Sequence, residues 1–322
     1  MYYAIRHLTR FRYPEPIRES LMELFMQPRS EGGQRLNAFA VSTQPRAQLF
    51  TYEDHLGNTV HHFNVLKDHA ELQIEMHASV EMAEIATLPE ALSSDAWDLL
   101  RPEMLNAEEY DMLHTQGLAV PCEGISAFLS EHAITRDSDP LTTLRALAWA
   151  VHDGFAYDTD ATDVDTPLEE VLKIKRGVCQ DFSHVMIAGA RALGIPARYV
   201  SGYLYHRNEI DDRPAPDATH SWVEAFMPGL GWIGIDPTNK TLAGHRHIRV
   251  GVGRDYADVP PTRGTFKGRH YSELAYAVSV QPAEAPIRPA AMLKVARKMD
   301  HAPVSADERG EAFYQQQQQQ QQ

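Results

Sequence analysis

The stretch Arg176-Gly177-Val178-Cys179-Gln180-Asp181-Phe182-Ser183-His184 is the most informative part of this sequence. It places a cysteine shortly after a glycine and at the predicted start of an apolar helix that runs to about Leu193. A helix N-terminus carries unpaired N–H groups and a partial positive charge, which together stabilise a thiolate. The thiolate is the nucleophilic form of cysteine. The pattern therefore predicts a reactive Cys179.

Two residues further along can complete a nucleophilic site with Cys179, namely His220 and Asp236. A cysteine nucleophile needs a base that takes its proton and a third group that orients the base. Residues 220–226 and 231–236 have the pattern of short strands, and their short connection predicts a hairpin. The order of the three residues therefore predicts a nucleophile, a base and an orienting carboxylate.

The register of this hairpin determines whether the imidazole and the carboxylate can meet. A turn centred near Pro228 places His220 directly opposite Asp236, whereas a turn centred on Gly229 makes the two residues diagonal neighbours. Both registers put the two side chains on one face of the sheet, because side chains alternate with a period of two. A bulge in either strand would break that parity.

Other polar residues near the predicted site are given structural roles. Asp181 lies in the first helical turn, where a carboxylate interacts favourably with the helix dipole. His184 is on a different face of the helix from Cys179 and is not expected to act as the base. Cys122 lies in a turn without a basic neighbour and is expected to be structural.

The composition is that of a globular protein, with 322 residues, 43% of them hydrophobic, and a net charge of −14. This length predicts two domains. The acidic charge argues against nucleic-acid and anionic-membrane partners, which require a basic face. Two cysteines are too few for a disulfide framework, and neither a secretory signal nor a membrane-spanning run is visible. We therefore expect a cytoplasmic protein. Its oligomeric state is not indicated.

Residues 1–88 are predicted to form a β-rich, sandwich-like domain. Aromatic and β-branched residues alternate along 3–13, as in a half-buried strand. Further strand patterns follow at 48–52, 59–65 and 72–80. Repeated short strands separated by turns are typical of a β-sandwich.

The rest of the chain is predicted to have three parts. Residues 89–138 form a helical connector divided by prolines. Residues 139–282 form an α+β core, which holds the Cys179 helix, the hairpin and a last strand at 271–280. Residues 283–322 are a low-complexity tail that ends in eight glutamines.

The sequence predicts no metal site and no cofactor. The acidic stretch 158–165 followed by Glu169 only partly matches a calcium-binding loop, because Asp163 stands where that loop requires glycine. The pair His61-His62 and the segment His245-Arg246-His247 lack further ligands at zinc-site spacing. These histidines are expected to lie on the surface.

Four blocks of the sequence together resemble the core of bacterial transglutaminase-like proteins. The match covers roughly residues 140–240, and the first 88 residues are similar to the β-rich N-terminal region of one subgroup of that superfamily. The blocks are Gly177-Val178-Cys179-Gln180-Asp181-Phe182, residues 192–203, His220-Ser221-Trp222-Val223-Glu224 and residues 231–239.

The resemblance implies a papain-like α+β fold in which helices pack on an antiparallel sheet. It implies that Cys179 is the nucleophile, His220 the base and acid, and Asp236 the orienting group. Members of this superfamily attack a carboxamide or peptide carbonyl and form a thioester, and for bacterial members hydrolysis is favoured over crosslinking. The expected partner is a peptide or protein substrate. Candidate oxyanion or substrate-positioning residues are Tyr157, Gln180 and Trp222.

Two other functions are considered. The chain could be a peptide-binding module that keeps this fold without catalysis, although such modules usually lose a member of the catalytic set. It could also transfer an acyl group from a thioester donor, as arylamine acetyltransferases do with the same triad logic. The sequence shows no coenzyme A signature, and the surroundings of Trp222 and Asp236 fit transglutaminase-like proteins better.

Overall fold

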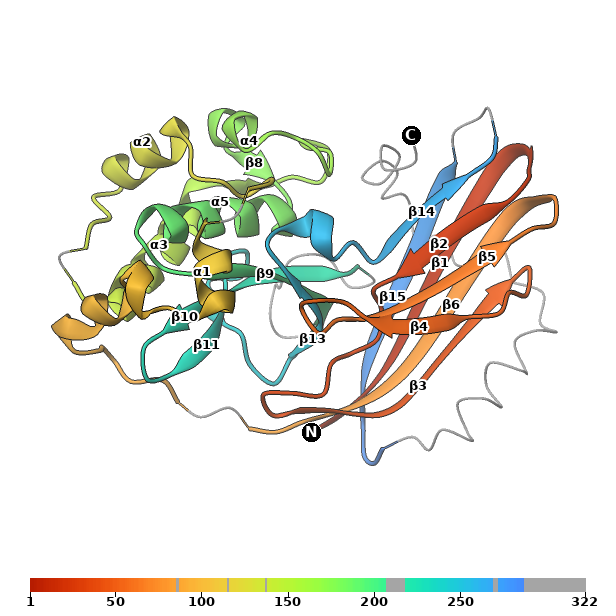
Figure 1. Cartoon of the computed structure of the whole chain (residues 1–322), viewed down its shortest axis with the longest axis horizontal. Coiled ribbons are helices and arrows are strands. Elements are labelled where there is room, and N and C mark those ends of the chain that lie inside the picture. Colours follow the sequence, from red (N-terminus) through yellow and green to blue (C-terminus); the bar gives the residue numbers. More distant parts are fainter. Residues whose placement is uncertain (85–86, 115, 137, 207–217, 269–271, 287–322) are drawn as a thin grey trace.

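The chain consists of a β-sandwich and a core in which helices cover a five-stranded sheet, joined along one side (Figure 1). The computed structural model describes residues 1–84, 87–114, 116–136, 138–206, 218–268 and 272–286. The predicted α+β class, with an N-terminal β domain before a papain-like core, is confirmed. Within the described residues, no helix has both the length and the apolarity needed to cross a bilayer.

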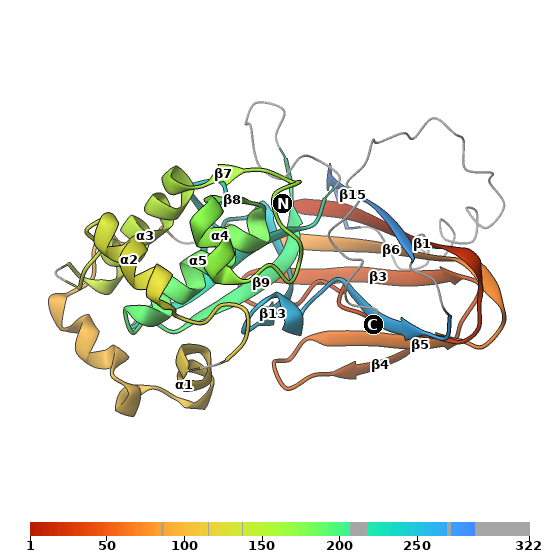
Figure 2. The same cartoon turned by 90° about the horizontal axis from the view of Figure 1, so that it is seen from above.

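The N-terminal sandwich consists of two four-stranded antiparallel sheets, which Figure 2 shows as separate layers. Along β1, every second residue from Tyr3 to Phe11 is buried, so the predicted alternation reflects a real inner face. These side chains fill the core between the sheets. The strands contributed by the N-terminal part are β1 (Tyr2–Ile17), β2 (Ser20–Leu24), β3 (Gln34–Gln44), β4 (Phe50–Glu53), β5 (Thr59–Val65) and β6 (His69–Met82).

Each sheet of the sandwich is completed by a strand from the C-terminal part of the chain. β14 (Thr262–Phe266) pairs with β2, and β15 (Glu273–Ala283) pairs with β1 over its whole length. The assignment of the strand at 271–280 to the catalytic core is therefore wrong, because this strand belongs to the N-terminal sandwich. Alternation along a strand reveals that one face is buried but does not identify the neighbouring strand.

Short helices connect the sandwich to the core. They are η1 (Ser94–Leu100), η2 (Pro102–Met104), α1 (Ala107–His114) and α2 (Glu123–Glu131). Among them, α2 packs against the central helix of the core, α5 (Cys179–Ala192).

Two further helices support α5, namely α3 (Pro140–Gly154) and α4 (Leu168–Ile174). The predicted N-cap of α3 is present, since Asp139 Oδ1 accepts hydrogen bonds from the N–H groups of Leu141 (3.0 Å) and Thr142 (3.2 Å). Every residue of α5 from Gln180 to Arg191 is buried, so this helix is surrounded on all sides. A short parallel pair, β7 (Ala156–Tyr157) and β8 (Arg176–Gly177), lies just before it.

The core sheet has the strand order β12-β11-β10-β9-β13, and α5 packs across β9 and β10. β13 forms one edge and is followed by η3 (Tyr256–Asp258). The strands are β9 (Ala197–Leu204), β10 (His220–Met227), β11 (Gly231–Asp236), β12 (Thr241–Leu242) and β13 (His247–Gly253).

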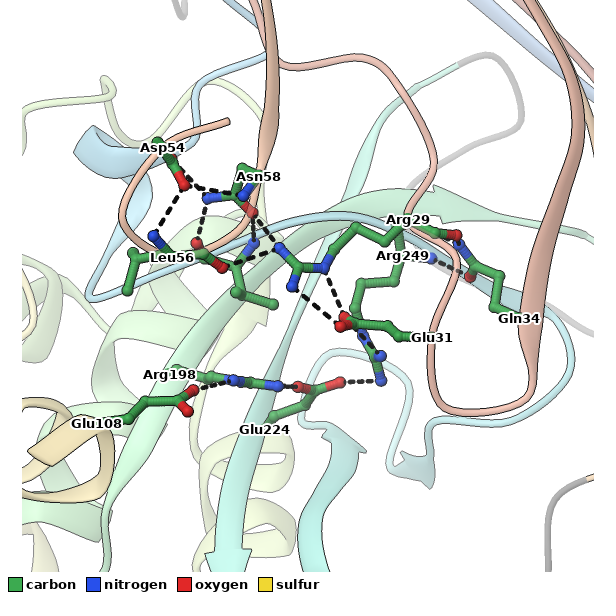
Figure 3. A network of polar contacts seen from close by, with 11 residues as sticks. Arg29, Glu31, Gln34, Asp54, Leu56, Asn58, Glu108, Arg198, Glu224 and Arg249 are labelled. Atoms are coloured by element: carbon green, nitrogen blue, oxygen red, sulfur yellow. Dashed lines mark hydrogen bonds and ion pairs between the residues drawn. The ribbon is translucent and has the colours of Figure 1, made fainter. Parts of the chain in front are cut away.

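Charged side chains connect the sandwich to the core sheet in an unbroken series (Figure 3). Arg249 of β13 pairs with Glu31 of the sandwich (3.2 Å) and with the buried Glu224 of β10. Glu224 also pairs with Arg198 of β9 (2.7 Å), and Arg198 reaches Glu108 of α1 (2.6 Å). The residues of β13 therefore have partners in both halves of the molecule.

Candidate active site

Cys179 is the first residue of α5, and its side chain is partly exposed. The residue before it, Val178, caps the helix, and its N–H donates to Asp181 Oδ2 at 2.8 Å. Thr162 Oγ1 donates to the same oxygen at 2.7 Å. A Cβ on Gly177 would lie only 2.3 Å from this oxygen, so glycine is required for the close approach of backbone and carboxylate. This local packing fixes the start of the helix that carries Cys179.

Asp181 lies in the first turn of α5, as the sequence predicts. Its side chain is buried, and burial raises its pKa to about 6 against the lowering effect of the hydrogen bonds from Thr162 and Val178. Its main visible role is to tie the helix start to the acidic loop that contains Thr162.

His220 and Asp236 are in direct contact. The hairpin pairs Val223 with Ile235 and Glu224 with Gly234, which is the register centred on Gly229. His220 and Asp236 are therefore diagonal neighbours on one face, as the longer turn predicts. The distance from His220 Nε2 to Asp236 Oδ2 is 2.7 Å, and both side chains are fully buried.

The hydrogen bond to Asp236 fixes the orientation of the His220 ring. An imidazole that donates from Nε2 to a carboxylate keeps Nδ1 available as a proton acceptor. In the structure, Nδ1 is buried and has no hydrogen-bond partner. Burial lowers the pKa of His220, but the charge of Asp236, its hydrogen bond and a smaller contribution from Cys179 outweigh burial and raise the pKa above its ordinary value.

The carboxylate of Asp236 is held by a dense set of donors. Its Oδ1 accepts the N–H groups of Thr238 (2.9 Å) and Asn239 (3.1 Å). Its Oδ2 accepts from the Asn239 side chain (2.8 Å) as well as from His220. Burial alone would raise the pKa of Asp236, but its histidine partners hold the pKa well below the usual range.

His247 is a member of this cluster that sequence reasoning missed. It was expected on the surface, but it is buried, and its Nε2 lies 3.1 Å from Asp236 Oδ2. The spacing of His245 and His247 gave no sign of this contact, because the partner carboxylate lies on β11 and approaches only when the sheet forms. A buried His61 also contradicts the surface prediction; its ring stacks on Phe39 and contacts Gln27.

The three additional candidates are placed differently. Trp222 is buried beside the two histidines, with its ring 5.2 Å from that of His247 and 6.1 Å from that of His220. The Gln180 side chain is buried and donates to the carbonyl of Val164 at 2.8 Å, so it holds the acidic loop. Tyr157 lies on β7, directly opposite Gly177 of β8 and close to the start of α5.

The two other residues assigned structural roles, His184 and Cys122, are packed against the core. His184 is buried, and its Nε2 accepts the N–H of Tyr256 at 3.2 Å on η3. Cys122 is half-buried at the N-cap of α2. Both observations agree with a packing role.

Within the described residues, the acidic loop brings no three ligand groups together, whereas His220, Asp236 and His247 hold atoms within 4.8 Å of one another. A metal ion there would have to displace the protons that both histidines direct at the carboxylate. The arrangement is therefore explained by hydrogen bonding alone.

Comparisons with known proteins place this geometry in a family context. Residues 128–237 match the transglutaminase-like superfamily, and residues 3–81 match the bacterial transglutaminase-like N-terminal region. The uncharacterized protein Rv2569c of Mycobacterium tuberculosis is 33% identical over 315 residues, which covers 88% of this chain and 93% of that protein. The protein-glutamine gamma-glutamyltransferase of Pseudomonas aeruginosa is 34% identical over 131 residues, which covers 36% of this chain and 19% of that protein.

A solved structure shares this fold over most of the chain. It comes from Cytophaga hutchinsonii, where the protein is named a "Putative Cysteine Protease", and it aligns with a TM-score of 0.68 at 17% identity over 89% of this chain and 93% of its own. At that identity the likeness establishes the fold. The resemblance seen in the sequence is confirmed along both parts of the molecule, and the chain belongs to the transglutaminase-like superfamily, with the N-terminal region of its bacterial members.

Proposed function

We propose that this protein is a cysteine-dependent acyl-transfer enzyme that acts on peptide or carboxamide bonds through a thioester. One observation carries the proposal. Asp236 holds Nε2 of His220, while Nδ1 of the same ring has no partner and Cys179 lies close enough to affect its pKa. A base with one nitrogen fixed and the other available beside a thiol is the arrangement that activates a cysteine.

The proposed reaction begins with proton transfer from the Cys179 thiol to Nδ1 of His220. The thiolate then attacks the substrate carbonyl carbon, and the C=O electron pair moves onto oxygen. When the tetrahedral intermediate collapses, the carbon–nitrogen bond breaks and the imidazolium returns its proton to the leaving amine or ammonia. Water then attacks the thioester carbonyl and gives a proton to His220. The carbon–sulfur bond breaks, the carboxylic acid is released, and His220 returns the proton to the Cys179 sulfur.

The start of α5 can stabilise the negative oxygen of the intermediate. The N–H of Cys179 precedes the first complete helical turn, so it has no partner within the helix and can donate to a bound oxyanion. Tyr157 remains the candidate for a second donor because of its place beside Gly177. Trp222 and Gln180 support the site without a direct role in the reaction. Trp222 packs on the histidines, and Gln180 holds the acidic loop at Val164.

We favour hydrolysis over crosslinking. Cys179 is partly exposed, and water exceeds any amine in concentration unless a site is built to exclude it. Names among the similar proteins include both outcomes, a glutamyltransferase and a protease. A peptide or protein is the proposed substrate, and the reaction requires no cofactor because the three side chains supply the nucleophile and the proton transfers.

A peptide-library screen with an added primary amine, followed by mass spectrometry, tests the proposal. Backbone cleavage, or conversion of glutamine to glutamate, is expected and should disappear in Cys179→Ala. Incorporation of the amine into the peptide would show that the enzyme transfers the acyl group to an amine and does not hydrolyse the thioester. Unmodified peptides, together with tight peptide binding by both proteins, would instead support the non-catalytic binding module.

A further inference from the structure

His247 occupies a defined tautomer in the cluster around Asp236. The N–H of Gly244 donates to its Nδ1 at 3.1 Å, so the ring proton resides on Nε2 and points at Asp236 Oδ2, 3.1 Å away. Burial is the largest influence and lowers the pKa of His247 below its ordinary value, against the opposing effect of Asp236. The ring is therefore a neutral hydrogen-bond donor near neutral pH.

The contact places two histidines on one carboxylate oxygen. Oδ2 receives the Nε2 protons of His220 and His247 and the side-chain amide of Asn239, while Oδ1 faces the backbone. A carboxylate held by donors on several sides cannot rotate about its Cβ–Cγ bond without losing one of them. His247 thus fixes the oxygen that in turn fixes His220.

His247 also separates this carboxylate from a cavity. A cavity of about 730 Å³ lies beside the core sheet, and both Trp222 and His247 contribute to its lining. Asp236 itself is completely buried and does not line that cavity. Loss of the imidazole would open a route for water to the carboxylate, and water would compete with His220 for the shared oxygen.

We propose that His247 is a positioning residue that holds Asp236 in the orientation required to direct His220 toward Cys179. The proposal rests on the proposed cysteine chemistry only for its catalytic consequence. The structural relationship among His247, Asp236 and His220 exists independently of any substrate.

Two substitutions separate this role from simple packing. In His247→Gln, the side-chain amide can reach the place of Nε2 and donate to Asp236. In His247→Asn, the shorter amide reaches only the place of Nδ1, near Gly244, so it conserves polarity without restoring the donor. Both variants remove the ring, and urea unfolding of each variant establishes that it is folded and how much stability it has lost.

The first readout is the protonation of His220, followed by long-range ¹H–¹⁵N NMR of the histidine rings over a pH series. Asp236 and Cys179 raise the pKa of this ring, and His247 acts on it through its hydrogen bond to Asp236. Weakening the Asp236 contact should move the His220 midpoint down by a pH unit or more in His247→Asn, and His247→Gln should keep it near the wild-type value. An unchanged midpoint in both variants, or an upward movement, would overturn the proposal.

The second readout is turnover of a peptide identified in the library screen. We expect kcat to fall about tenfold in His247→Asn with KM unchanged, as for loss of other groups that orient a reacting side chain. An increase in KM at constant kcat would contradict a positioning role. If the wild-type protein shows no turnover, the proposed function fails, and the NMR comparison still decides the role of His247.

Discussion

The side-chain amide of Asn58 pairs with both backbone groups of Val252, donating to its carbonyl and accepting from its N–H, each at 2.8 Å. Gln34 does the same for Arg249, with its Nε2 2.7 Å from the carbonyl and its Oε1 2.8 Å from the N–H. Two sandwich side chains thus take the place of a neighbouring strand along the outer edge of β13. These amides, together with one backbone hydrogen bond from the N–H of Arg29 to the carbonyl of Arg249 (3.1 Å), close this edge of the core sheet.

Asn58→Ala should destabilise the protein by about 2 kcal/mol or more, because a buried N–H and a buried carbonyl on Val252 lose their partners. Urea unfolding measures the change. The exposed Asn64 on β5 provides a matched control, and Asn64→Ala should leave the midpoint almost unchanged. Equal effects of the two substitutions would show that the sandwich does not support β13 through this amide.

Iodoacetamide should modify Cys179 much faster than Cys122, because only Cys179 combines a helix start with a neighbouring imidazole. Mass spectrometry of tryptic peptides over time gives the two rates. Cys122→Ser should retain the fast phase, and Cys179→Ser should abolish it. Similar slow rates for both thiols would remove the basis for a nucleophilic role.

Gly177→Ala should both destabilise the protein and slow alkylation of Cys179. The new methyl group would lie 2.3 Å from Asp181 Oδ2, so the carboxylate that holds Val178 and Thr162 must move. Overpacking of this kind costs roughly 1–3 kcal/mol. Gly244→Ala is the control for stability, since the nearest atom to its Cβ would be a carbonyl oxygen at 4.0 Å. If Cys179 of the Gly177→Ala variant is alkylated at the wild-type rate, Gly177 is not needed to fix the start of the helix that carries Cys179.

Protonation of His7 should lower the free energy of unfolding of the protein as the pH falls. His7 is buried between Tyr203 (3.0 Å) and Thr9 (3.2 Å), and burial lowers its pKa from 6.5 to about 4. Between these two values the unfolded chain binds a proton that the folded chain does not, so protonation favours unfolding. The contribution is roughly 2–3 kcal/mol by pH 4.5 and levels off below pH 4.

Asp181, with a pKa raised to about 6, makes the folded protein more stable as the pH falls and so opposes the effect of His7. Because Asp181 is present in both proteins, the difference in stability between wild type and His7→Gln isolates the effect of His7. The stability difference between the two should shift in favour of the glutamine variant between pH 7.5 and 4.5. His55→Gln, at an exposed position, controls for the substitution itself. A pH-independent difference for His7→Gln would contradict the assignment.

Local patterns in the sequence predicted much of this molecule. Helix caps such as Asp139 and the strand pair that carries His220 and Asp236 follow from rules that operate over a few residues. The position of β15 and the contact between His247 and Asp236 depend on strands that are distant in the chain. No local periodicity encodes which strand will be the neighbour, so these features required the folded structure.

The chain leaves the sandwich after β6 and returns to it only with β14 and β15. During translation, the ribosome must therefore finish the core before it delivers the last strands of the first domain. Until then, the β1 edge later covered by β15 is open in the nascent protein and can pair with other chains. The same connectivity means that the sandwich cannot be completed before the whole core has been synthesised.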